Sequence, residues 1–255
     1  MVDSLAAVVL AAGPGTRLAP LTRVRPKALC PVGDRPLVDH ALAGVEAVVG
    51  TGPERVAVNA HAHREQLEAH VAGRAFASVE EPVALGTAGA LARLRPWLDG
   101  RPVLVVNGDA WAPGDLGPLV EGWDGELVRV LVASDPAQPL GPATRVLGSL
   151  LSWQEVLAIP DHGVSGLTTV SWGPAAAGGR LEQVGGPRPF VDCGRPADYL
   201  AANLAASGGR SVVGEGAQVE GTLERSVVWP GGVVRPGEHL VDAVRVGDWL
   251  TVLVR

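Results

Sequence analysis

Short runs of apolar residues alternate with helix-like stretches along the first half of the chain, and this alternation constrains the fold more than any other feature. The strand-like runs lie at 5–10, 54–59, 75–80, 102–107 and 127–133, and the helix-like stretches lie at 37–48, 61–72 and 87–98. Short buried strands that alternate with amphipathic helices are typical of βαβ units. The sequence therefore predicts an α/β fold, a three-layer α/β/α domain with a mainly parallel mixed sheet. Such sheets bind ligands beyond the carboxyl ends of their strands, so the residues that follow each run are the candidate site.

The composition changes near residues 207–210, and a second pattern follows. Beyond this point Val or Leu recurs about every six residues, with glycines between them, at Val213, Val219, Val227, Val233 and Leu240. A hexapeptide period with glycine in the turns predicts a short solenoid, a left-handed β-helix-like tail, and an ordinary β-hairpin is the alternative. We therefore expect a catalytic domain at 1–207 and the tail at 208–255.

The tail carries two tryptophans, Trp229 and Trp249, and a strand edge that we expect to be unpaired. Unpaired strands and apolar patches seek partners, so the sequence predicts subunit contact and a possible homodimer. Packing of the tail on the first domain is the alternative.

Charge and hydropathy exclude several classes of protein. The formal net charge is −6, whereas a non-specific nucleic-acid binder needs a basic face. The longest apolar run, 5–12, is far shorter than the roughly 18 residues of a membrane span, and no basic residue precedes it as in a secretory signal. Two cysteines, Cys30 and Cys193, cannot build a disulfide framework, and we interpret them as small buried residues. We expect a cytoplasmic protein with no nucleic-acid or membrane partner.

One lysine stands out among the basic residues. Of the 21 Lys and Arg residues, 20 are Arg and only Lys27 is Lys. In a chain that drifts towards Arg, a retained Lys is a candidate for a position that needs a compact point charge rather than a planar fork. Chance survival of a surface lysine is the alternative.

A glycine-rich segment, VVLAAGPGTRL at 8–18, follows the first predicted strand. Glycine allows close approach of backbone N–H groups to phosphate, but the segment matches neither the Walker A spacing nor the three-glycine Rossmann pattern. Four cations and two prolines lie at the end of this segment and just beyond it: Arg17, Arg23, Arg25, Lys27, Pro20 and Pro26. Because proline prevents a regular helix, the segment predicts a rigid basic loop that suits a polyphosphate rather than a solvated charged face.

At residues 10–42 the chain reads LAAGPGTRLAPLTRVRPKALCPVGDRPLVDHAL, which resembles the signature of sugar-1-phosphate nucleotidyltransferases. Three further segments resemble landmarks of that family in the same order: EEPVALGTAGAL at 80–91, VVNGDAW at 105–111 and FVDCGRPADYL at 190–200. The hexapeptide tail is similar to that of many members, notably mannose-1-phosphate guanylyltransferases. The resemblance implies a Rossmann-like nucleotidyltransferase domain.

The resemblance also implies a reaction in which a sugar-1-phosphate oxygen attacks the α-phosphorus of a nucleoside triphosphate and pyrophosphate leaves. Because two anions must approach each other, the protein has to supply positioning and positive charge. Carried over from the family, Arg17 would contact the β- and γ-phosphates, Lys27 would lie near the α-phosphate, and Asp109 and Asp192 would hold Mg²⁺. A turn residue is the alternative for Asp109, and a turn or helix cap for Asp192.

The same carry-over gives a set of nucleotide-binding residues: Leu10, Ala11, Ala12, Gly13, Gly15, Thr16, Glu81, Gly86, Thr87 and Gly108. The small residues at 86–89 would permit close approach to base and ribose, and a helix N-terminus at Thr87 would favour an anion. Glu81 reads equally well as a carboxylate that recognises a guanine edge and as a solvated strand end.

The resemblance is poor at 136–187. Members of the family carry a Glu-Lys-Pro motif and an Asn-Ala-Gly segment between the two aspartates, and this chain has neither. Gly148 and Ser149 could replace the small and polar residues there, Arg145 the missing cation, and Arg195 stands in the place of a threonine.

Two hypotheses follow: an active enzyme with an altered sugar pocket, or a non-catalytic regulatory subunit that binds a nucleotide sugar. The retained cations and aspartates favour the enzyme. We place GTP and mannose-1-phosphate first, then UTP, dTTP and ATP.

Overall fold

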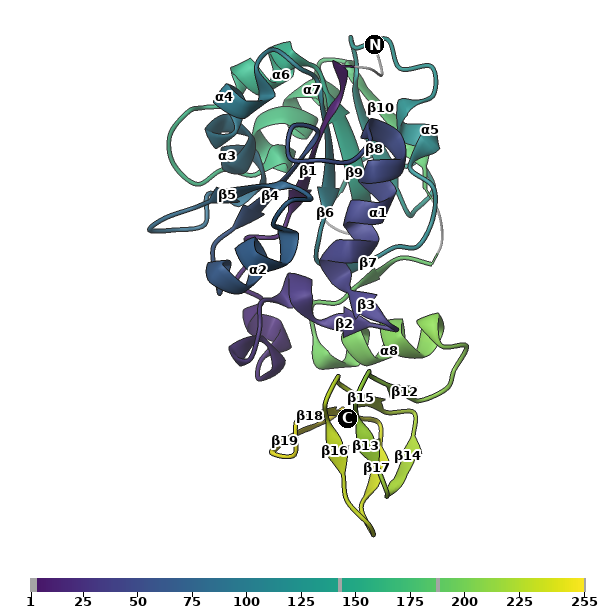
Figure 1. Ribbon diagram of the computed structural model, residues 1–255. Helices are drawn as coiled ribbons and strands as arrows, with labels where there is room; N and C mark the ends of the chain where they lie inside the picture. The colour runs from purple at the N-terminus through teal and green to yellow at the C-terminus, as the bar shows by residue number, and fades with distance from the viewer. Residues whose placement is uncertain (1–3, 142–143, 187–188, 255) are drawn as a thin grey trace. The chain divides into compact units, whose positions relative to one another are not determined.

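The computed structural model describes residues 4–141, 144–186 and 189–254 (Figure 1). Its packing divides the chain into two compact units. Unit 1 comprises Met1–Pro14, Val38–Gly108 and Ala112–Phe190, and unit 2 comprises Gly15–Leu37, Asp109–Trp111 and Val191–Arg255. The expected domain limits at 207 and 208 stay a prediction. Within the described ranges, no helix is both long and apolar enough to cross a bilayer.

Unit 1 is built on a seven-stranded sheet in the order β10-β8-β9-β6-β1-β4-β5. Strand β9 is antiparallel to both of its neighbours, and the other neighbouring pairs are parallel. The strands are β1 (Ala6–Leu10), β4 (Val56–Ala60), β5 (Phe76–Val79), β6 (Val103–Asn107), β8 (Val128–Val132), β9 (Val146–Leu151) and β10 (Leu181–Gly185).

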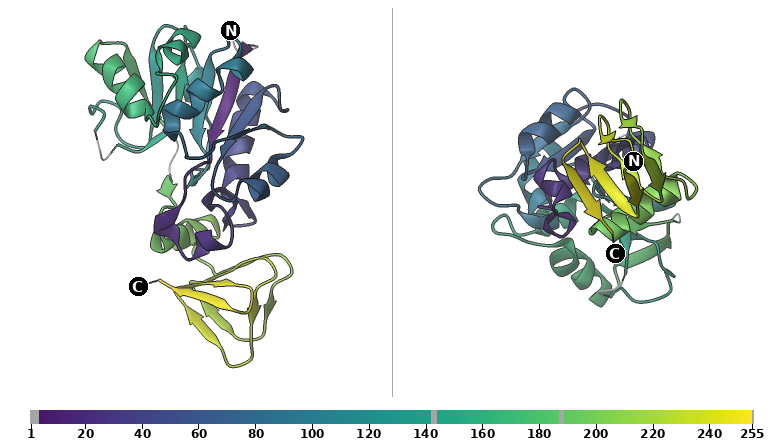
Figure 2. Two further views of the ribbon diagram at one scale, coloured as in Figure 1. Left: turned by 90° about the vertical axis from the view of Figure 1, so that its left-hand side faces the viewer. Right: turned by 90° about the horizontal axis from the view of Figure 1, so that it is seen from below.

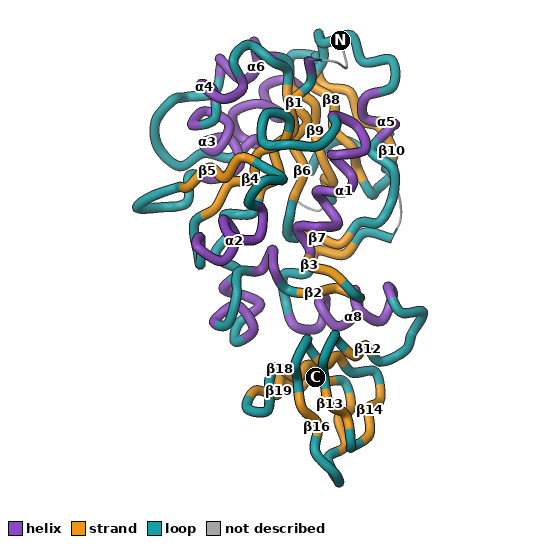
Figure 3. Tube along the Cα trace, viewed as in Figure 1, coloured by secondary structure: helices purple, strands orange, loops and turns teal. Residues whose placement is uncertain are grey.

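Helices cover both faces of this sheet, as Figure 3 shows by colour. One face of β1, with Ala6, Val8 and Leu10, packs in a buried cluster with Leu91 and Leu94. The other face is covered by α1, which an ion pair between Asp39 and His70 joins to α2. The helices are α1 (Leu37–Val49), α2 (Arg64–Val71), α3 (Gly86–Arg93), α4 (Arg95–Leu98), α5 (Gly117–Val120), α6 (Trp153–Ala158), a π-helix (Thr168–Trp172) and α7 (Gly173–Ala177).

The predicted three-layer fold with a mainly parallel mixed sheet is confirmed. Each predicted strand and helix lies within a few residues of an observed one, although the 87–98 stretch divides into α3 and α4. The poorly matched region supplies β9, α6 and β10, which periodicity did not predict. Since β9 is the antiparallel strand, this region also accounts for the mixed character of the sheet.

Unit 2 gathers three separate segments of the chain around its own apolar core. The elements of its first two segments and of 191–206 are three short 3-10 helices (Thr16–Leu18, Leu21–Arg23 and Lys27–Leu29), β2 (Pro31–Val32), β3 (Arg35–Pro36), β7 (Ala110–Trp111), β11 (Val191–Asp192) and α8 (Pro196–Ala206). Arg195 stands at the N-cap of α8, and Asp198 lies in its first turn.

The tail in unit 2 consists of very short parallel strands, seen in yellow in Figure 2. Strand β15 pairs with β12 and β18, β13 with β16, and β14 with β17, so three narrow parallel ladders form the sides of a β-helix-like coil. The bounds are β12 (Val212–Val213), β13 (Gln218–Val219), β14 (Thr222–Glu224), β15 (Val227–Val228), β16 (Val233–Val234), β17 (His239–Val241) and β18 (Ala243–Val246); β19 (Leu250–Leu253) adds an antiparallel edge. The coil replaces the alternative of a simple hairpin, and its handedness stays a prediction.

Trp229 packs inside unit 2, which corrects its expected role in subunit contact. Its side chain is fully buried in one cluster with Leu18, Leu21 and Tyr199. The indole Nε1–H donates to Tyr199 Oη at 2.9 Å, and the guanidinium of Arg25 lies 4.4 Å from the ring centroid. The tail is therefore part of the core that supports the basic loop. Trp249 is exposed, and the homodimer stays a prediction.

Candidate active site

The first part of the glycine loop belongs to unit 1. Leu10 ends β1, and Ala11 and Ala12 are buried directly after it. Gly13 is exposed, and so is Thr16, which begins the first 3-10 helix of unit 2. The loop thus starts from a fixed strand end and then becomes accessible.

Gly15, the first residue of unit 2, stands at a position of its loop where only glycine fits. Its φ is 61°, and a Cβ there would meet Thr22 Cγ2 at 2.8 Å and Lys27 Cβ at 3.1 Å. The Thr22 hydroxyl donates to the Gly15 carbonyl at 3.0 Å. A side chain at this position would therefore displace the segment that carries Lys27.

Four predicted catalytic residues gather in unit 2. The Lys27 ammonium lies 3.0 Å from Asp109 Oδ2 and 3.1 Å from Asp192 Oδ1. The antiparallel pairing of β7 with β11 sets Asp192 opposite Ala110, so the neighbouring carboxylates of Asp109 and Asp192 reach one cation. Arg17 Nη2 lies 3.8 Å from Asp192 Oδ2 on the exposed side. Residues 165 positions apart thus form one charged cluster.

Lys27 is the buried centre of this cluster: its side chain is 6% exposed, against 37% for Asp109 and 42% for Asp192. Burial alone would lower the pKa of Lys27, but the attraction of Asp109 and then of Asp192 outweighs it and raises the pKa above the ordinary lysine value. The ammonium therefore stays charged through the neutral range. The alternative of a surface lysine is excluded by its burial.

The two aspartates fit a divalent cation by the chemistry of their donors. They supply hard carboxylate oxygens on partly exposed side chains, and Mg²⁺ typically binds one or two carboxylates while it keeps waters and substrate phosphates. Among the described residues, no group of three or more His, Cys, Asp or Glu side chains is arranged to hold a metal alone. Any metal here would thus need further oxygen donors beyond the pair.

Gly108, in unit 1, is fixed by close packing on β1. Its N–H donates to the Leu10 carbonyl at 2.8 Å, and a Cβ would meet Val9 Cγ1 at 2.7 Å. Any larger residue would move the strand end from which Asp109 follows in sequence. The packing of Gly108 on β1 therefore explains why this position needs glycine, without reference to a bound nucleotide.

The turn at Gly86 and Thr87 is packed against 163–167. A Cβ on Gly86 would lie 2.5 Å from the Ser165 carbonyl oxygen, and Thr87 Oγ1 accepts from Leu167 N at 2.8 Å. The N–H groups of Ala88 and Gly89 donate to that same Ser165 carbonyl at 3.0 and 3.4 Å. These two donors in the first turn of α3 are therefore engaged internally, and the anion site expected at Thr87 itself stays a prediction.

Glu81 lines a pocket of unit 1 with a volume of about 760 Å³. The lining residues are His61, His63, Arg64, Glu65, Gln66, Glu81 and Pro82. Arg64 Nη1 lies 2.9 Å from Glu81 Oε1, so the carboxylate has a defined partner. The Glu81 side chain is 59% exposed, so its role in recognising a base stays a prediction beside the alternative of a solvated strand end.

The replacements that we expected in the poorly matched region have different surroundings. Arg145 is exposed. Gly148 and Ser149 are buried inside the sheet, where Ser149 is opposite Val105 and Val130. A Cβ on Gly148 would meet the Val105 carbonyl at 2.8 Å, which explains the small residue by packing.

The cysteines are buried thiols, as predicted. Burial raises the pKa of Cys30 and of Cys193 to about 12, so neither is a thiolate near neutral pH. They pack in the unit 2 core. Covalent catalysis by a cysteine is therefore not supported.

Two buried polar residues of unit 1, Asn59 and Glu80, had no role in the sequence analysis. Each is the last residue of a predicted strand run, and the sequence analysis placed them only near the edge of the sheet where ligands are expected to bind. Asn59 is 3% exposed and Glu80 is 0% exposed. A charged residue that is fully buried at a strand end would have marked this pair as important. A single sequence does not reveal burial, so the sequence analysis could not find it.

Residues 6–132 match the profile of the nucleotidyl transferase family. The chain belongs to this family, as the glycine loop and the charged cluster indicate.

Two curated relatives are similar in sequence. The N-acetylmuramate alpha-1-phosphate uridylyltransferase of Caulobacter vibrioides is 36% identical over 53% of this chain and 60% of its own length. The mannose-1-phosphate guanylyltransferase of Mycobacterium tuberculosis is 35% identical over 45% of this chain and 33% of its own length. The matches thus span less than two thirds of either relative.

Among solved structures, a Thermus thermophilus protein described as mannose-1-phosphate geranyltransferase aligns with a TM-score of 0.69. The alignment covers 98% of this chain and 95% of that one at 20% identity. It supports the fold over nearly the whole chain, including the tail.

Proposed function

We propose that the protein transfers a nucleotidyl group from a nucleoside triphosphate to a sugar-1-phosphate and releases pyrophosphate. The observation that carries this proposal is the cluster in which buried Lys27 lies between Asp109 and Asp192. A buried ammonium with two partly exposed carboxylates suits a reaction between anions. Membership of the nucleotidyl transferase family supports the same assignment.

In the proposed reaction an oxygen of the sugar phosphate forms a bond to the α-phosphorus, and the bond from that phosphorus to the β-phosphate bridging oxygen breaks. Lys27 stabilises the negative charge that develops around the α-phosphate, and its raised pKa keeps it protonated. The exposed fork of Arg17 binds the departing phosphates. Bound Mg²⁺, held by Asp109 and Asp192, would neutralise phosphate charge.

We propose GTP as the nucleotide and mannose-1-phosphate as the sugar phosphate. A carboxylate offers only acceptors, and the edge of guanine presents two adjacent donors, N1–H and N2–H₂. Glu81 in its pocket provides those acceptors, and Arg64 provides donors for the guanine O6. The similarity to the Mycobacterium guanylyltransferase supports both choices.

Uridylyl transfer is the second candidate, because the Caulobacter relative that carries this name shares 36% identity with the chain. The two candidates differ in the base and the sugar but use the same phosphate chemistry. Glu81 would then pair with one donor of uracil, N3–H.

The test is pyrophosphate release with Mg²⁺, measured for GTP, UTP, dTTP and ATP against several hexose-1-phosphates and N-acetylmuramate-1-phosphate. Release with one pair, lost with Lys27→Ala and after chelation of the metal, supports the proposal. Calorimetry with the same nucleotides is run in parallel. Tight nucleotide-sugar binding without release from any pair would overturn catalysis and identify the non-catalytic regulatory subunit.

A further inference from the structure

Two buried polar side chains lie between the nucleotide-binding segments of unit 1. Asn59 is near the carboxyl end of β4, and Glu80 follows β5. The two strands are neighbours in the sheet, and β4 also pairs with β1, from which the glycine loop starts. The pair is therefore enclosed among the strand ends that precede both predicted binding segments.

Asn59 binds the start of the glycine loop. Its Oδ1 accepts from Ala11 N at 2.6 Å and from Ala12 N at 3.3 Å. These two backbone donors fix the orientation of the amide, because the opposite orientation would set the NH₂ group against two N–H groups. The other end of the amide, Nδ2, donates to Glu80 Oε1 at 2.8 Å.

Glu80 continues the chain of hydrogen bonds to the turn at 85–87. Its second oxygen, Oε2, accepts from Leu85 N at 2.6 Å, one residue before Gly86. Its own backbone is held as well, since its N–H donates to Ala60 O at 2.8 Å and its carbonyl lies 2.9 Å from His61 Nδ1. Both carboxyl oxygens thus face donors, and a residue with a single acceptor cannot replace them.

We infer that Asn59 and Glu80 are positioning residues for the nucleotide: together they hold the glycine loop and the turn at 85–87 in one geometry. The connection runs Ala11 N–H, Asn59, Glu80, Leu85 N–H, and each step has its donor and acceptor matched. Because the network is buried, a mismatched step cannot be repaired by water at low cost. This inference rests on the proposed function, since it makes nucleotide affinity depend on residues that touch no nucleotide.

The direction of each hydrogen bond in the network can be tested by exchanging the amide and the carboxylate between positions 59 and 80. Glu80→Gln sets an amide NH₂ against either Asn59 Nδ2 or Leu85 N, and Asn59→Asp sets one carboxylate against another. In the double variant the new aspartate accepts from the loop N–H groups and from the new glutamine amide, whose oxygen accepts from Leu85 N. The double variant has the same net charge as the original pair and restores every hydrogen bond.

The expected result is a rise in the Kd for the triphosphate, on the order of tenfold or more, in each single variant, with at least partial recovery in the double variant. The KM for the sugar phosphate is expected to stay unchanged, which separates this role from general loss of structure. Glu182→Gln is the matched control: Glu182 pairs with Arg129 at 2.7 Å between β8 and β10, at the opposite end of the same sheet. It should leave the Kd unaltered.

Hydrogen exchange of the free protein tests the coupling without any nucleotide. In Glu80→Gln the amides of Ala11 and Ala12, which Glu80 does not contact, should exchange faster, and Glu182→Gln should not affect them. Unchanged exchange and unchanged Kd in both single variants would overturn the inference, as would a double variant no better than either single one. If the wild type binds no nucleotide while the exchange result holds, the proposed function fails and only the coupling of the two segments stands.

Discussion

The two groups of predicted site residues are built on different physical principles. In unit 1 the segments expected to bind the nucleotide are held through their backbones, by buried hydrogen bonds from Asn59 and Glu80 and by close packing at Gly86 and Gly108. In unit 2 the site consists of charged side-chain ends around Lys27, partly open to solvent. Under the proposed function, nucleotide recognition would therefore depend on a backbone shape that tolerates little substitution, whereas the phosphate chemistry would depend on a few charges.

The largest effect is expected from Lys27→Ala, which removes the central charge of unit 2. We expect kcat/KM to fall on the order of 10³-fold, the size of effect seen when one preorganised donor to a developing charge is lost. Nucleotide affinity should change much less, because the unit 1 segments remain intact. Steady-state kinetics with calorimetry measures both quantities.

Lys27→Arg is the control that keeps the charge and changes its shape. A planar fork cannot sit compactly between Asp109 and Asp192, so activity should stay low. Full activity in Lys27→Arg would show that only the sign of the charge matters and would contradict the role given to a compact ammonium.

The next largest effect is on the stability of unit 2. Trp229→Ala empties a fully buried position beneath Arg25 and Tyr199, and removal of a core tryptophan costs about 3–5 kcal/mol of unfolding free energy. Trp249→Ala is the matched control, since that indole is 67% exposed and should change stability by less than about 0.5 kcal/mol. Denaturant unfolding of the full chain measures both.

If the tail merely adjoined the basic loop, Trp229→Ala would leave catalysis at the wild-type level in the folded protein. The shared core predicts instead that activity falls under conditions where the chain still binds nucleotide. Loss of activity with retained nucleotide binding would show that the two units contribute separately to catalysis and to binding.

How far the site could be predicted follows the same contrast. Lys27 stood out because it is the only lysine among 21 basic residues, and the aspartates lie in segments that resemble family motifs. A side chain whose charge is itself needed can be found from the sequence, as a rare residue type or as part of a motif. The burial of Glu80 and the contact of Ser165 with the 86–89 turn depend on tertiary packing, so periodicity and motifs could not predict them.

The fold shows the same limit. The alternation of strands and helices predicted most of unit 1 because each element buries a regular face. The alternation did not predict β9. Its central residues Gly148 and Ser149 were interpreted as part of a binding segment, whereas they pair with β6 inside the sheet. Nor could periodicity show that residues 15–37 and 109–111 pack with the tail in unit 2.

A smaller effect is expected in the choice of base. Glu81→Gln exchanges one acceptor for a donor, which suits uracil better than guanine, so the ratio of kcat/KM for GTP to that for UTP should fall about tenfold. Glu65→Gln removes the same charge from the same pocket and is the matched control. An equal fall in both variants would show that the effect is only one of charge, and an unchanged ratio in Glu81→Gln would remove Glu81 from base recognition.

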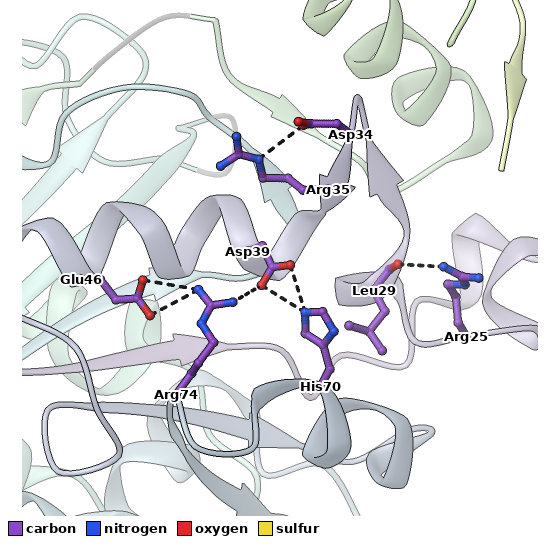
Figure 4. Close-up of polar contacts among 8 residues, drawn as sticks. All are labelled: Arg25, Leu29, Asp34, Arg35, Asp39, Glu46, His70 and Arg74. Carbon is purple, nitrogen blue, oxygen red and sulfur yellow. Dashed lines mark hydrogen bonds and ion pairs between the residues drawn. The ribbon is translucent and has the colours of Figure 1, made fainter. Parts of the chain in front are cut away.

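The smallest effect concerns a carboxylate that supports unit 1 without touching the site. Asp39 on α1 binds His70 at 3.0 Å and Arg74 at 2.7 Å, and Arg74 also binds Glu46 (Figure 4). Burial alone would raise the pKa of Asp39, but His70 and then Arg74 outweigh it and lower the pKa. Asp39→Asn should therefore cost roughly 1 kcal/mol of unfolding free energy at pH 5–6.

The pH dependence gives the sign of this contribution. Because the folded pKa is below the unfolded value of about 3.9, the stabilisation is fully present above that pH and is lost as the pH falls through the folded pKa. The difference between wild type and Asp39→Asn should thus shrink towards pH 3. Asp34→Asn in unit 2 is the control, since Asp34 pairs with Arg35 on the surface and its removal should have no measurable effect at any pH (Figure 4). A difference for Asp39→Asn that stayed constant from pH 6 to pH 3 would assign its cost to packing rather than to the charge.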